Sequence, residues 1–167
     1  MDDKTTNLAE RITLRPAVFP DDEEFLVALY YTTRDDIQAA PIDEEQKKSL
    51  SIMQYIAQKQ HYLSQFPDSK HDIILLEEKR AGRFWTMRSK TEILIVDLAI
   101  MPEYRNMRIG TFLLQQAIEE AARTSRVVNL SVLKTGEAAI RLYKRLGFRV
   151  SGEIPTHFQM RWQPENE

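Results

Sequence analysis

The sequence predicts an α/β (α+β) fold in which a central mixed β-sheet of about seven strands is flanked by about four helices. Residues 93–100 read ILIVDLAI, an apolar run that suits a strand covered on both faces. From Thr111 apolar residues recur at helical spacing, and in residues 127–133 they alternate with polar ones. A strand, a helix and a strand in this order predict a right-handed crossover between parallel neighbours. A predicted hairpin elsewhere makes the sheet mixed.

The two ends of the chain and the first strand are read from polarity and from one proline. Residues 1–10 and 164–167 are polar, and we expect both segments to fray. Residues 12–18, ITLRPAV, alternate as a half-buried strand does. Pro16 confines this strand to a sheet edge or to a strand end, because proline lacks the N–H that a central ladder needs.

Two helices follow, and each is preceded by an acidic residue whose partner three positions later can return the hydrogen bond. Such a pair is the capping box of a helix N-terminus. Between the two helices, residues 34–41 read RDDIQAAP and predict a loop that is long and polar enough to shape a binding site. The pairs are Asp21 with Glu24, before a helix over residues 22–33, and Asp43 with Gln46, before a helix that ends near Pro67.

The remaining elements alternate strands with helices. One further helix precedes Gly147, which is placed to end it in the left-handed conformation. The elements are an antiparallel hairpin of residues 72–77 and 82–88, the strand, helix and strand already described, a helix over 137–146, and strands at 148–151 and 157–162. Residues 1–167 are therefore expected to form a single domain.

Composition excludes several classes of protein. The chain of 167 residues contains no cysteine, which excludes a disulfide framework, a thiolate nucleophile and a cysteine-ligated zinc. Its three histidines lack metal-ligand spacing, so no metal is expected. A net charge of −2 gives no global field for nucleic acid or an anionic membrane. Without a signal-peptide core or an apolar run of about 20 residues, we expect a soluble cytoplasmic protein.

The turn between the apolar strand and the following helix is the first candidate site. It reads RNMRIGT over residues 105–111. A helix that begins there points unpaired N–H groups and the positive end of its dipole at the turn, which favours a phosphate. Arg105 and Arg108 add charge-assisted contacts. The alternative is a solvated basic turn, because the stretch lacks both the P-loop and the dinucleotide-binding pattern.

Two segments, read together, resemble the GNAT superfamily of acyl-CoA-dependent N-acetyltransferases. One is Pro102-Glu103-Tyr104-Arg105 ahead of Ile109-Gly110, and the other is LYKRLGF over residues 142–148. The resemblance covers nearly the whole chain and is nearest to a group of bacterial single-domain members. The motifs of that group read here Arg34-Asp35-Asp36, Met53-Gln54 with Ala57-Gln58 and Tyr62, and Met160-Arg161-Trp162-Gln163-Pro164.

The resemblance implies acetyl-CoA as cofactor and assigns residues to it. In the family the strand before the turn splays from its neighbour and pairs with the pantetheine arm, and the pyrophosphate sits on the turn. Glu137 stands where many members have an asparagine that helps to hold the cofactor. By position the cofactor residues are Leu98, Ala99, Ile100, Arg105, Asn106, Met107, Arg108, Ile109, Gly110, Thr111 and Glu137.

The implied reaction is direct attack of a primary amine on the thioester. Tyr143 is the family's general acid, which protonates the leaving thiolate; without the family it reads as a core tyrosine on a helix's apolar face. Asp97 or Glu92 can act as the base, while the other reading of Asp97 is a hydrogen-bond acceptor within the strand. The residues expected to face the substrate are Tyr31, Arg34 and Asp35, with an ordinary polar loop as the alternative.

The nature of the acceptor and the occurrence of catalysis stay open at this point. A small-molecule amine or a peptide amine both fit the resemblance, and a homodimer paired through a final strand is common in the family. Arg108 stands where glycine is frequent, and Glu137 replaces an asparagine. These two departures favour the alternative of a non-catalytic GNAT-fold protein that senses an acyl-CoA or serves as an interaction module.

Overall fold

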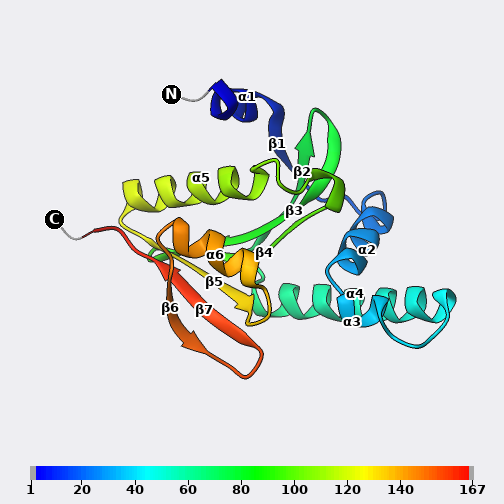
Figure 1. The fold of residues 1–167 in the computed structure, drawn as a ribbon. Helices are drawn as coiled ribbons and strands as arrows, with labels where there is room; N and C mark the ends of the chain where they lie inside the picture. The colour runs from blue at the N-terminus through cyan, green and yellow to red at the C-terminus, as the bar shows by residue number, and fades with distance from the viewer. Residues whose placement is uncertain (1–2, 166–167) are drawn as a thin grey trace.

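The computed structural model describes residues 3–165, which build one mixed seven-stranded sheet with helices on both faces (Figure 1). The strand order is β1-β2-β3-β4-β5-β7-β6, and only β4 and β5 pair in parallel. The predicted mixed sheet of seven strands is confirmed. The strands are β1 (Ile12–Pro16), β2 (Lys70–Leu76), β3 (Lys79–Arg88), β4 (Glu92–Ile100), β5 (Val127–Leu133), β6 (Arg149–Glu153) and β7 (His157–Trp162).

The described residues form six α-helices rather than about four. Within the polar segment 1–10, for which we predicted fraying, the described residues belong to a helix, Asp3–Arg11, and Leu8 joins the hydrophobic core. Residues 1–2 and 166–167 lie outside the described part. The helices are α1 (Asp3–Arg11), α2 (Glu23–Thr32), α3 (Asp35–Gln38), α4 (Glu44–Gln65), α5 (Ile109–Thr124) and α6 (Glu137–Arg145), with a 3₁₀ turn η1 (Pro102–Tyr104).

The predicted loop 34–41 contains α3, so it is shorter and more regular than expected. The two predicted capping boxes have different outcomes. Asp43 and Gln46 form both bonds of the box, at 2.8 and 3.1 Å, at the start of α4. The prediction of a capping box formed by Asp21 and Glu24 is wrong, because the N-cap of α2 is Asp22, whose side chain makes no capping hydrogen bond.

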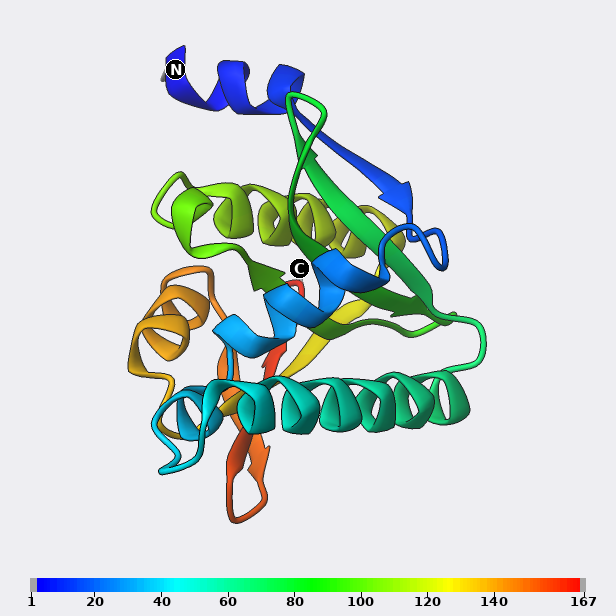
Figure 2. The same ribbon diagram turned by 90° about the vertical axis from the view of Figure 1, so that its right-hand side faces the viewer.

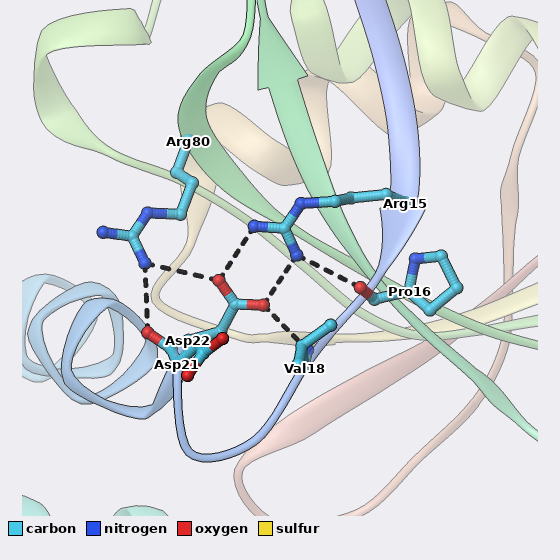
Figure 3. Close-up of polar contacts among 6 residues, drawn as sticks. All are labelled: Arg15, Pro16, Val18, Asp21, Asp22 and Arg80. Atoms are coloured by element: carbon cyan, nitrogen blue, oxygen red, sulfur yellow. Dashed lines mark hydrogen bonds and ion pairs between the residues drawn. The ribbon is translucent and has the colours of Figure 1, made fainter.

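That N-cap residue, Asp22, instead ties three segments together through its buried carboxylate (Figure 3). Arg15 of β1 donates two hydrogen bonds to it, at 2.7 and 2.9 Å, and Arg80 of β3 donates a third at 3.3 Å. The backbone N–H of Val18 adds another at 2.8 Å. Pairing with Arg15 holds the pKa of this carboxyl well below its usual range. The cluster fixes where α2 begins relative to the sheet.

The sheet separates two hydrophobic cores. On one face, residues of α5 such as Leu114 and Ala117 pack against Ile93 of β4. On the other face, seen from the front in Figure 2, α2 and α4 cover the sheet with Leu29 and Tyr55. None of the described helices is both long and apolar enough to span a membrane. Each face of β4 therefore meets a different set of helices.

A β-bulge in β4 decides which side chains go to which face. Trp85 of β3 lies opposite Asp97 and its neighbour lies opposite Ile95, so Val96 has no partner on β3. Before the bulge Ile95 points into the α5 core, and after it Leu98 packs against the same core. The alternation of side chains between the two faces of β4 is therefore shifted by one residue at the bulge. The prediction of a strand buried on both faces holds only in part, because every residue from Val96 to Ile100 is half-buried.

Candidate functional site

The site is built around the point at which β4 and β5 separate. The two strands pair from Glu92 to Ile95 on β4, and no later pair is formed, whereas β5 continues beside β7 as far as Leu133. A bulge increases the local twist of a strand, and this one lies directly after the last pair. A cavity of about 1050 Å³ opens here, lined by the ends of both strands and by α2, α4, α6 and the turn before α5.

The edge of β4 that faces this opening offers unpaired backbone groups. Met101 donates its N–H to Ala81, whereas the carbonyl oxygen of Ile100 accepts from Nε of Arg105 at 3.0 Å. Because backbone groups alternate along a strand, Leu98 and Ile100 direct theirs towards the opening. An extended ligand that enters the opening can therefore pair with β4 in place of β5.

The turn before α5 presents a row of free backbone donors. No described residue accepts a hydrogen bond from any of the six backbone N–H groups of residues 106–111, and the first to bond back is that of Phe112, to Arg108. Asn106 and Arg108 both have a left-handed backbone, with φ of 63° and 64°. Residues in that region turn successive N–H groups to one side, which makes an anion-binding concavity.

Basic side chains surround these donors. Arg108, Arg141 and Arg145 line the cavity, and none of the three forms an ion pair with a described residue. Arg105 differs, because its guanidinium bonds to the Ile100 carbonyl oxygen and to Thr32 of α2 at 3.3 Å. The turn therefore combines backbone donors with three uncommitted cations, which favours a phosphate group.

Tyr143 of α6 reaches the cavity from the α5 side of the sheet. Its ring packs on Phe148 with 5.8 Å between centroids, and Gly147, with φ of 97°, ends the helix between them. Burial, and secondarily the charge of Asp97, raise the pKa of the Tyr143 phenol to about 12. The phenol is therefore protonated at neutral pH and can donate a proton.

Asp97 lies on the other face of β4, held by Arg83 of β3. Nε of Arg83 donates to Oδ2 of Asp97 at 2.7 Å, and Nη2 donates to Gln58 of α4, also at 2.7 Å. The side chain of Arg83 is 4% exposed and that of Asp97 is 26% exposed. Tyr62 of α4 lies beside them, and burial, followed by the charge of Asp97, raises its pKa to about 12. Asp97 is thus both an ion-pair partner and a cavity residue.

The structure brings most of the predicted residues together. Glu92 accepts a hydrogen bond from Asn129 at the far end of β4 and does not line the cavity. Met107 packs against the α5 core instead, and Tyr31, Asp35 and Glu137 are also absent from the lining. The predicted residues that do line it are Arg34, Asp97, Leu98, Ala99, Ile100, Arg105, Asn106, Arg108, Ile109, Gly110, Thr111 and Tyr143.

The sequence reading missed several lining residues. Arg141 and Arg145 are four positions apart on α6, so their shared face was readable from the sequence. Tyr30 lies within a helix pattern and Arg83 within a strand pattern, and only the fold brings them to the cavity. The described residues include no group of three or more His, Asp or Glu side chains that could hold a metal ion.

Residues 41–148 match the model of the Acetyltransferase (GNAT) family. No curated protein matches. Among solved structures, PaiA N-acetyltransferase from Thermoplasma acidophilum, in complex with coenzyme A, is 19% identical over 91% of this chain and 98% of its own, with a TM-score of 0.66.

Two other solved structures share the fold. Ard1 from Thermoplasma volcanium is 19% identical over 93% of this chain and 99% of its own, with a TM-score of 0.64. Naa50 from Arabidopsis thaliana, in complex with the bisubstrate analogue CoA-Ac-MVNAL, is 15% identical over 92% of this chain and 99% of its own, with a TM-score of 0.59. At these identities the likeness concerns the fold, which the strand order and the parting of β4 from β5 already describe.

Proposed function

Because the chain belongs to the acetyltransferase (GNAT) family, we propose that it transfers an acetyl group from acetyl-CoA to a primary amine by direct attack of the amine on the thioester. The observation that carries the proposal is the opening between β4 and β5 next to a turn whose six backbone N–H groups have no acceptor among residues 3–165. An extended arm with a pyrophosphate at one end fits these two features together.

The donor substrate is held by backbone groups more than by side chains. No described residue accepts from the N–H groups of residues 106–111, and a phosphate provides the acceptors that they lack. Arg108, Arg141 and Arg145 add positive charge around it. On β4, the backbone groups of Leu98 and the N–H of Ile100 pair with the amide groups of the pantetheine arm, whereas the Ile100 carbonyl oxygen already accepts from Arg105.

Two groups of this chain act on the reacting thioester. The N–H of Leu98 lies at the opening and donates to the carbonyl oxygen as negative charge develops on it. Tyr143 donates its phenolic proton to the sulfur as the C–S bond breaks. Burial keeps this phenol protonated beforehand, because it raises the pKa to about 12. Hydrogen bonding to the sulfur then favours transfer in the transition state.

On the α2 and α4 side, Asp97 is the residue that we propose faces the incoming amine, either directly or through water. Its side chain is partly exposed in the cavity, beside Tyr62. Arg34 lines the same region, so it remains in the proposed acceptor site. We leave Tyr31, Asp35 and Glu92 out of that site because they do not reach the cavity.

Thermal unfolding with and without acetyl-CoA tests the proposal. At a hundredfold excess over Kd the ligand should stabilise the protein by about 2.7 kcal/mol, which is roughly 5–10 °C in Tm for a chain of this size. Thiol release in the presence of amines tests turnover, and the chain adds no background because it has no cysteine. An unchanged Tm at millimolar acetyl-CoA contradicts the proposal that acetyl-CoA is the acetyl donor. Stabilisation without thiol release from any amine favours the sensor alternative.

A further inference from the structure

The acceptor side of the cavity, on the α2 and α4 face of the sheet, has cations that are already committed to partners. Arg34 donates to Asp36 through Nε at 2.9 Å and through Nη2 at 2.7 Å, and its Nη1 donates to the hydroxyl of Tyr30. This fork–fork pair engages Nε and Nη2 and places a carboxylate directly against the guanidinium. The positive charge of Arg34 is therefore already balanced by Asp36.

Arg83, the second cation on this side, is committed as well. Its Nε and Nη2 bond to Asp97 and Gln58. The remaining nitrogen, Nη1, is buried without a partner among the described residues. Protein atoms cover it, so an acceptor in the cavity does not reach it. Arg105 bonds at the level of Ile100, three residues or about 10 Å further along β4 from Asp97.

One carboxylate oxygen on this side of the cavity, Oδ1 of Asp97, has no hydrogen-bond donor among the described residues. Both contacts from Arg83 to Asp97 end on Oδ2, and no described residue donates to Oδ1. Tyr62 and Tyr143 line the same cavity, and burial, followed by the charge of Asp97, raises the pKa of both phenols to about 12, so both are neutral. The acceptor therefore meets an unshared carboxylate oxygen in a cavity that two neutral aromatic side chains also line.

We propose that the acceptor is an amine that enters the cavity as a cation and carries no carboxylate or phosphate beside its nitrogen, with Oδ1 of Asp97 accepting a hydrogen bond from its ammonium. This rests on the proposed acetyl transfer. A charged amine without an adjacent anion complements the free oxygen and the aromatic rings. An α-amino acid would place its own carboxylate near Asp97, where Arg34 and Arg83 already have carboxylate partners and do not balance it.

The proton balance of the step is consistent with this role. The ammonium first loses one proton to water, and the neutral nitrogen then forms its bond to the carbonyl carbon while the C–S bond breaks. The sulfur takes a proton from Tyr143, and the phenol recovers one from the nitrogen through water. An ammonium and a thioester thus give an amide, a thiol and one released proton. Asp97 binds the amine and guides it, and no oxidant or further reactant is needed.

Matched acceptors test the inference. Phenethylamine, phenylalaninamide and phenylalanine share one side chain and differ in the group beside the nitrogen. Thiol release should give a kcat/KM at least about tenfold higher for each of the two acceptors without the carboxylate. Equal or higher kcat/KM for phenylalanine overturns the inference while leaving acetyl transfer intact.

Variants separate the charge of Asp97 from its effect on Arg83. Asp97→Asn should raise KM for the cationic acceptors by about tenfold and leave the Kd of acetyl-CoA unchanged. Gln58→Met is the matched control, because it also removes a partner of Arg83 but keeps the carboxylate. Equal increases in KM for both variants overturn the role of Oδ1. Absence of turnover with every cationic acceptor, while acetyl-CoA still raises Tm, also overturns the inference, whereas an unchanged Tm refutes the proposed function itself.

Discussion

Arg108 sets two effects against each other, so replacing it by glycine tests the account of the turn before α5. The residue is the N-cap of α5 and has a left-handed backbone, with φ of 64° and ψ of 19°. Its side chain lines the cavity on the side proposed for the phosphates and is exposed. Arg108→Gly removes backbone strain and one positive charge in the same step.

The change should stabilise the protein in the absence of ligand. A side chain in the left-handed region costs roughly 1–2 kcal/mol, and the greater freedom of glycine in the unfolded chain returns about 0.5–1 kcal/mol of this. The net gain is about 0.5–1 kcal/mol, or roughly 1–4 °C in Tm for a chain of this length. No side-chain hydrogen bond of Arg108 offsets this gain, since the N-cap makes none.

The same change should weaken binding of coenzyme A. A charge-assisted bond is worth about 1.5–3 kcal/mol where water is excluded, but the exposure of Arg108 brings the value down to about 1 kcal/mol. The Kd should therefore rise about fivefold. The loss should shrink at high ionic strength, because salt screens exposed charges.

Calorimetry of the free protein and titration with coenzyme A measure the two effects separately. Asn106→Gly is the matched control, because Asn106 has the same left-handed backbone, with φ of 63°, but no charge. Asparagine tolerates this conformation, so its replacement should change neither Tm nor Kd appreciably. A lower Tm for Arg108→Gly refutes the strain argument, and an unchanged Kd refutes the assignment of this arginine to a phosphate.

Three further predictions concern the proposed general acid, the ion pair of Figure 3 and a close backbone contact. Tyr143→Phe should lower kcat by about 10²–10⁴-fold with the Kd of acetyl-CoA unchanged, and an equal kcat in thiol-release assays would exclude a general acid here. Asp22→Asn should cost about 1–3 kcal/mol in urea unfolding, because the carboxylate is buried while its two arginine partners are 36% and 42% exposed. Since pairing lowers the pKa of Asp22, its stabilisation is complete above about pH 4 and is lost on further acidification, so the gap to the variant should close; a constant gap contradicts the ion-pair account. Gly82→Ala should cost about 1–3 kcal/mol, because a Cβ there would lie 2.2 Å from the carbonyl oxygen of Ala99, whereas Gly110→Ala, with its nearest contact at 3.8 Å, should not.

The sequence was a good guide wherever a local pattern decides the structure. The capping box of Asp43 and Gln46 formed as predicted, because both partners lie within one helical turn. The apparent box at Asp21 failed, because the adjacent Asp22 finds arginines that come from β1 and β3. Those partners are distant in sequence, and no local pattern reveals them.

Helix α1 and the α2 and α4 side of the cavity also depend on contacts between residues that are distant in the sequence. Residues 3–11 are polar in composition, and the packing of Leu8 into the core, which only the fold supplies, gives the helix a buried side. Likewise Arg83 and Tyr62 come from β3 and α4, and neither strand nor helix periodicity marks them as neighbours of Asp97. The free N–H donors of the turn before α5 were predictable from the sequence because they are the backbone groups of one continuous segment.

The bulge at Val96 could in principle be predicted from the sequence, because Asp97 is the one charged residue in an apolar run. Had residues 93–100 kept strict alternation, Asp97 would share the face of Ile93 and Ile95 and would carry its charge into the α5 core without a partner, which is costly. One extra residue restores the phase: Leu98 returns to that core, and Asp97 turns to Arg83 on the opposite face. The twist that accompanies the bulge falls where β4 leaves β5. The charge of Asp97 therefore accounts both for the register of β4 and for the position of the opening. The bulge that it requires also places the Asp97 carboxylate beside that opening.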